Sequence, residues 1–107
     1  MQSDTGTEGI LSTYYLFLSM VYCDSYDFVE AQSRIEKALS LSQKNNEKIY
    51  EGMSKIWFGR ILGKKGQSEF VAAKDYIQDG IKILERLMIK PWIAEGYLFM
   101  GELDAIS

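Results

Sequence analysis

Residues 68–88 read SEFVAAKDYIQDGIKILERLM, and this stretch separates apolar from charged residues at helical spacing. Its apolar and small positions recur mostly every three or four residues, at Phe70, Ala73, Ile77, Gly80, Ile81, Leu84 and Leu87. Charged and amide side chains, from Lys74 to Arg86, fill most of the other positions and therefore lie on the opposite side of a helix. The pattern predicts an amphipathic helix that buries one face against a neighbour.

Helical signals extend outward from this stretch in both directions. They predict four further helices at about residues 8–23, 28–43, 46–64 and 91–105. Asp27 is a suitable N-cap for the second, with Glu30 three residues later as in a capping box. Gly66 follows the third, and Pro91 opens the last, where its missing N–H costs nothing. No stretch favours a strand, so we expect an all-α protein with five helices in antiparallel pairs.

A spaced motif recurs in the first, third and fifth of these helices. It reads Tyr15-x-x-Leu18-Ser19-x-x-Tyr22, Lys55-x-x-Phe58-Gly59-x-x-Leu62 and Tyr97-x-x-Met100-Gly101-x-x-Asp104. The second and fourth helices add Ala31, Ile35 and Ala38, and then Ala73, Ile77 and Gly80. Small residues let two helices approach closely, while large residues one turn away fill the flanking holes. The motif therefore predicts helix pairs that repeat along the chain.

This spacing resembles the tetratricopeptide repeat over essentially all of residues 8–107. The motif recurs after 40 and 42 residues, whereas the standard repeat has about 34. Lys55 and Asp104 stand where the family has large residues. The resemblance implies a single domain, residues 1–107, built as a helical-repeat superhelix. The helix at 91–105 then corresponds to the first helix of a third repeat, so we expect a fragment of a longer array.

A second resemblance concerns residues 73–103, AKDYIQDGIKILERLMIKPWIAEGYLFMGEL. This stretch is similar to repeats found behind the ATPase and nucleotide-cyclase domains of large bacterial signalling proteins. The similarity implies that the chain is the regulatory part of a larger signalling protein. The phosphate-loop motif G-x-x-x-x-G-K-[ST] does not occur in the sequence.

The tetratricopeptide resemblance also implies a binding groove, which the first helices of successive repeats line. It assigns this groove to Leu16, Phe17 and Met20, to Ile56, Trp57 and Arg60, and to Leu98, Phe99 and Glu102. Phe17, Trp57 and Phe99 share one repeat position and would form a row of aromatic rings. Such a row would anchor an apolar helix or an extended peptide. The same aromatic spacing is also typical of a packed core, so both interpretations stay open.

Composition limits the remaining function classes. The chain has 12 basic and 15 acidic residues, without the basic stripe typical of nucleic-acid binding. His is absent and Cys23 is the sole cysteine, so the commonest general base and metal ligand are missing. We expect no enzymatic activity, no cofactor and no metal. The apolar run at residues 10–22 is too short to cross a membrane, and a lone cysteine favours a cytoplasmic location.

The leading expectation is a non-catalytic module for protein–protein interaction or scaffolding. Its partner would be a protein, a peptide or the neighbouring repeats of a parent chain. Two alternatives remain open. The face of the fifth helix and the aromatic groove could bury each other in a homodimer, or the groove could be an apolar pocket that senses a small ligand.

Overall fold

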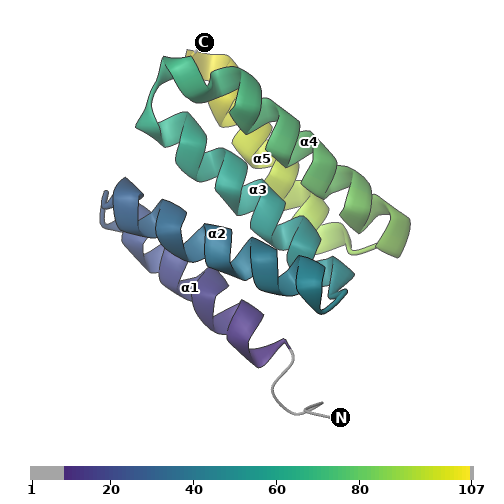
Figure 1. The fold of residues 1–107 in the computed structure, drawn as a ribbon. Helices are drawn as coiled ribbons and strands as arrows, with labels where there is room; N and C mark the ends of the chain where they lie inside the picture. The colour runs from purple at the N-terminus through teal and green to yellow at the C-terminus, as the bar shows by residue number, and fades with distance from the viewer. Residues whose placement is uncertain (1–8, 107) are drawn as a thin grey trace.

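Five helices follow one another in the computed structural model, which describes residues 9–106. They are α1 (Ile10–Asp24), α2 (Phe28–Lys44), α3 (Lys48–Lys65), α4 (Phe70–Leu87) and α5 (Lys90–Ile106), with a 3₁₀ turn at Gln67–Glu69. Successive helices run in opposite directions; α3 lies between α2 and α4, and α5 packs mainly against α4 (Figure 1). No strand occurs among the described residues. The prediction of an all-α chain with five helices is confirmed.

The helix ends differ from the predicted ends where the backbone takes an unusual conformation. The helix predicted at 68–88 begins instead with the 3₁₀ turn, which follows Gly66 at a φ of 154°. It ends before Met88, because Met88 adopts a left-handed conformation with a φ of 60°. Glu8, where the first helix was expected to begin, lies outside the described residues. These differences of one or two residues leave the order of the helices unchanged.

Carboxylates accept hydrogen bonds at the starts of two helices, Asp27 at the start of α2 and Glu47 at the start of α1. The Asp27 side chain accepts a hydrogen bond from the Glu30 N–H at 3.3 Å, at the N-cap position indicated by the sequence. Glu47, which directly precedes α3, accepts hydrogen bonds from the Gly9 N–H and from the Ser12 hydroxyl (2.5 Å). A negative charge is favourable at a helix N-terminus. Glu47 therefore connects the start of α1 to the start of α3.

Glycines allow α3 and α4 to approach closely. A Cβ atom placed on Gly59 would lie 2.5 Å from the Ala73 carbonyl oxygen, and one on Gly80 would lie 2.6 Å from the Gly52 carbonyl oxygen. Both distances are far below a normal carbon–oxygen contact. A side chain at either position would force the two helices apart, so Gly59 and Gly80 lie at a true helix–helix contact.

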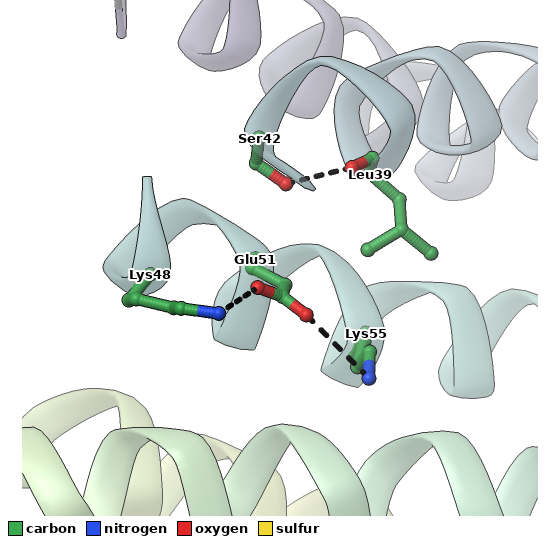
Figure 2. A network of polar contacts seen from close by, with 5 residues as sticks. All are labelled: Leu39, Ser42, Lys48, Glu51 and Lys55. Carbon is green, nitrogen blue, oxygen red and sulfur yellow. Dashed lines mark hydrogen bonds and ion pairs between the residues drawn. The ribbon is translucent and has the colours of Figure 1, made fainter. Parts of the chain in front are cut away.

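A buried carboxylate lies near the start of α3. Glu51 Oε1 is 3.3 Å from Lys48 Nζ, and Glu51 Oε2 is 3.7 Å from Lys55 Nζ (Figure 2). Burying an unpaired carboxylate is unfavourable, and the two lysines compensate for its charge. In the facing part of α2, the Ser42 hydroxyl donates to the Leu39 carbonyl oxygen at 2.8 Å. Glu51 and Ser42 therefore both find their partners within their own helices.

Candidate functional site

Four of the predicted groove residues form one cluster between α3 and α5. The Trp57 and Phe99 rings are both buried and meet edge to face, with centroids 5.2 Å apart. The Arg60 guanidinium lies over both rings, 4.9 Å from the Trp57 centroid and 4.2 Å from that of Phe99. Arg60 Nε is also 3.6 Å from Glu102 Oε1. Arg60 therefore covers the aromatic pair on its outer side.

Little open space remains beside this cluster. The cavity there has a volume of about 40 Å³ and is lined by Arg60, Gly63, Lys64, Phe99, Glu102 and Leu103. A water molecule requires at least roughly 10–15 Å³ on the same measure, so the cavity has room for very few. Ile56, a further predicted groove residue, is also buried. Trp57, Phe99 and Ile56 thus contribute to the core in this structure.

The other predicted groove residues lie away from the cluster. Phe17 on α1 is 54% exposed, and Leu98 on α5 is 62% exposed. Met20 is partly buried against the core, while its neighbour in the predicted set, Leu16, is fully buried. Among the aromatic contacts of the described residues, Phe17 takes part in none. The three rings expected in a row are therefore a pair, Trp57 with Phe99, and a separate exposed ring.

The Glu95 carboxylate supports the aromatic pair from within α5. The Trp57 Nε1–H donates a hydrogen bond to Glu95 Oε1 at 3.1 Å. Burial raises the pKa of the Glu95 carboxyl, while the hydrogen bond from Trp57 and the charge of Arg60 act in the opposite direction.

Burial also raises the pKa of the Cys23 thiol on α1, which keeps this thiol in the unreactive protonated form.

A second pattern recurs in α1, α3 and α5. Each helix carries four residues at steps of four, three and four, of which the second is large and the other three are small. The positions are Ser12, Leu16, Ser19 and Cys23 in α1, Gly52, Ile56, Gly59 and Gly63 in α3, and Ala94, Leu98, Gly101 and Ala105 in α5. All members in α1 and α3 are buried. In α3, Gly52 and Gly59 face α4, whereas Gly63 faces Leu103 of α5. In α5 all four are exposed.

We call these four exposed residues of α5 the α5 outer face. A Cβ atom on Gly101 would meet no atom within 4 Å, whereas one on Gly59, the matching glycine of α3, would strike α4. The acidic side chains nearby are paired with other helices, Glu102 with Arg60 and Asp104 with Lys74 at 2.9 Å. The α5 outer face is therefore uncharged, open and built to the same spacing as a buried helix contact.

Gly101 belongs to the spaced motif and Leu98 to the predicted groove, whereas Ala94 and Ala105 belong to neither. The signal that could have found them is the offset of 42 residues between α3 and α5, which maps Gly52 and Gly63 onto these alanines. What the sequence alone could not supply is their exposure, because the matching residues of α1 and α3 are buried.

Searches of protein families, of curated proteins and of solved structures found no match to this chain. Within residues 9–106, no group of three or more His, Cys, Asp or Glu side chains is placed to hold a metal ion. None of the described helices has the length and apolar character needed to span a membrane.

Proposed function

We propose that this chain is a helical-repeat module of the tetratricopeptide type that binds a helix of another protein on the α5 outer face. The observation that supports the proposal is the repeated pattern of small and large residues. The same pattern on α3 receives α4 at Gly52 and Gly59, and on α1 it belongs to the helix that packs mainly against α2, whereas on α5 it receives no helix of the described chain.

The helices that cover α1 and α3 indicate the chemistry of the partner. Both present a small residue, an isoleucine and a small residue at steps of four and three, namely Ala31, Ile35 and Ala38 in α2 and Ala73, Ile77 and Gly80 in α4. All six are buried. The partner would accordingly be an amphipathic helix with this spacing, because a small residue must lie opposite Gly101 for the backbones to approach.

The proposed role is scaffolding without catalysis, within a larger signalling protein. Support for the signalling context comes from the resemblance of residues 73–103 to repeats in bacterial ATPase and cyclase proteins. A neighbouring repeat of a parent chain would present the same kind of helix as a separate protein. Both occupants would therefore contact the α5 outer face in the same way.

A synthetic peptide with the sequence of residues 70–87 provides a direct test, because this helix already fits the matching face of α3. We expect the fluorescently labelled peptide to bind the folded chain saturably. Gly101→Leu should weaken binding about tenfold or more, since a side chain there blocks close approach. Gly101 lies in open space, so this variant should remain folded.

The matched control is a peptide in which Ala73 and Gly80 are both replaced by Leu, which keeps the helix apolar but removes its small residues. We expect this peptide to bind at least about tenfold more weakly. Absence of binding by the first peptide, or equal binding to the parent chain and to Gly101→Leu, would contradict the proposal. Circular dichroism of each variant confirms that the comparison is made between folded chains.

A further inference from the structure

A second uncovered surface lies on α1, on the side away from its contact with α2. Ile10, Tyr14, Phe17 and Val21 follow one another there at steps of four, three and four, and each is between 54% and 62% exposed. We call these four residues the α1 stripe. From Ile10 to Cys23 the helix carries no charged side chain. Depletion of charge combined with exposed aromatic residues is typical of the core of a protein interface.

The residues that follow the α1 stripe by 40 positions in α3 and by 82 positions in α5 are mostly buried. They are Tyr50, Ser54, Trp57 and Ile61 in α3, and Trp92, Gly96, Phe99 and Leu103 in α5. Of these eight, only Tyr50 and Trp92 are partly exposed. In α3 and α5 this side is therefore covered, for example where Trp57 contacts Phe99 and where Gly96 lies against Ile81, and of these three helices α1 alone leaves it uncovered among the described residues.

The α1 stripe is self-complementary in an antiparallel pair. Its spacing is the same in both directions, and its residues read aliphatic, aromatic, aromatic, aliphatic. A two-fold axis beside the middle of α1 would place Ile10 opposite Val21 of a second copy, and Tyr14 opposite Phe17. An interface between identical surfaces requires this symmetry, and a two-fold contact closes without leaving an open end.

An open hollow lies beside one half of the α1 stripe. Its volume is about 430 Å³, and it is lined by Gly9, Ile10, Thr13, Tyr14 and Tyr50. In the antiparallel arrangement, Phe17 and Val21 of the second copy face this half of the stripe. Each copy would therefore offer both the protruding side chains and the hollow that receives them.

From these observations we infer that two copies of the chain associate through their α1 stripes as an antiparallel, two-fold symmetric helix pair. Taking roughly 125 Å² of exposed surface for each of the eight large apolar residues in the two stripes, the pair would bury on the order of 1,000 Å² in total. This area lies near the lower limit for specific interfaces, so the association is of moderate strength. The absence of charge on the stripe removes the repulsion that two acidic chains would otherwise meet there.

The inference is independent of the proposed function, because it concerns α1 and the proposed partner helix binds α5. A different contact between two copies, with the α1 stripe of one on the α5 outer face of the other, would be open-ended and would extend into a filament. A foreign helix on α1 is the remaining alternative. The experiments below give a different result for each arrangement.

The first experiment measures solution mass by sedimentation equilibrium over a series of micromolar concentrations. The parent chain should approach twice the monomer mass of 12.3 kDa. Phe17→Lys should weaken the association about tenfold or more, because it buries a charge opposite Tyr14. Val71→Lys, on an α4 residue that is 77% exposed, is the matched control and should leave the dimer unchanged.

Three results would overturn the inference. A monomer at all concentrations would exclude pairing of two copies and leave α1 to a foreign partner. Masses beyond the dimer that are abolished by Leu98→Lys would show the open-ended contact between α1 and α5. A dimer that withstands Phe17→Lys would place the contact elsewhere on the molecule.

The second experiment tests the antiparallel direction and leaves both aromatic residues intact. One chain carries Ile10→Cys and the other carries Val21→Cys; the native Cys23 is buried. Mild oxidation of the mixture should give a disulfide-linked dimer in much higher yield than oxidation of either variant alone. Equal or higher yields from the separate variants would indicate a parallel pair and would overturn the proposed geometry.

Discussion

Gly59 and Gly101 occupy the same position of the spaced sequence motif, yet their surroundings predict opposite effects of one methyl group. At Gly59 the new Cβ would lie 2.5 Å from both the Ala73 carbonyl oxygen and Ile77 Cγ1. We expect Gly59→Ala to lower the free energy of unfolding by about 1–3 kcal/mol, because α3 and α4 must separate. Gly101→Ala should raise it by about 0.5–1 kcal/mol, since alanine favours a helix interior and space is free there.

Urea denaturation of the two variants and the parent chain measures both effects. Gly80→Ala is a useful third variant, because its Cβ would also strike backbone, the Gly52 carbonyl oxygen. It should behave like Gly59→Ala. If Gly101→Ala proved as destabilising as Gly59→Ala, the α5 outer face would have to be covered in solution, contrary to the structure of the single chain.

Glu95 gives the stability a dependence on pH. Its raised pKa means that the folded chain holds this proton more tightly than the unfolded chain does. The contribution of Glu95 to the free energy of unfolding therefore falls as pH rises from the ordinary carboxyl range through the raised pKa. Glu95→Gln keeps an oxygen that can accept the Trp57 N–H but does not titrate. We expect this variant to be more stable than the parent chain at neutral pH, with the difference shrinking in acid.

Thermal unfolding between acidic and neutral pH, followed by Trp fluorescence, measures this difference. Glu36→Gln on the exposed side of α2 is the matched control and should show no comparable dependence on pH. A Glu95→Gln variant that was less stable than the parent chain at every pH would mean that the attraction between Glu95 and Arg60 outweighs the cost of burial.

The helices themselves could be predicted from the sequence because their apolar residues recur at helical spacing and their ends carry recognisable caps. Asp27 is one such cap. The end of α4 could not be predicted in the same way. Met88 closes this helix in a left-handed conformation, with its N–H bonded to the Glu85 carbonyl oxygen. Methionine has no preference for that conformation, so the sequence carries no signal for it.

Which side of each helix is covered could be predicted only in part. α3 has apolar residues around most of its circumference, so the periodicity of its sequence does not distinguish a groove from a core. Trp57 is buried against Phe99 and Glu95 of α5, whereas Phe17, which lies 40 residues earlier in the sequence, is exposed on α1. Exposure at these positions thus depends on the number of neighbouring helices, which the local sequence does not encode.

At the scale of the whole molecule, the helices form an elongated body with principal extents of 47 × 29 × 19 Å. α3 contacts all four other helices, while α1 and α5 lie at the two ends of the series. The α1 stripe and the α5 outer face are therefore the two surfaces at which the regular stacking is interrupted. In such a series each helix pair gains its stability mainly from adjacent pairs, so the terminal helices should open more readily than the middle.

Hydrogen exchange should reveal this gradient along the chain. We expect the amides of α3, near the fully buried Ile56 and Ile61, to exchange only through global unfolding. The amides of α5 should exchange faster by local detachment, because one side of this helix makes no contact within the described chain. If two copies pair through the α1 stripe, protection in α1 should rise with protein concentration while protection in α5 stays constant. A rise confined to α5 would assign the contact to the α5 outer face, and equal protection in α3 and α5 at low concentration would contradict the gradient.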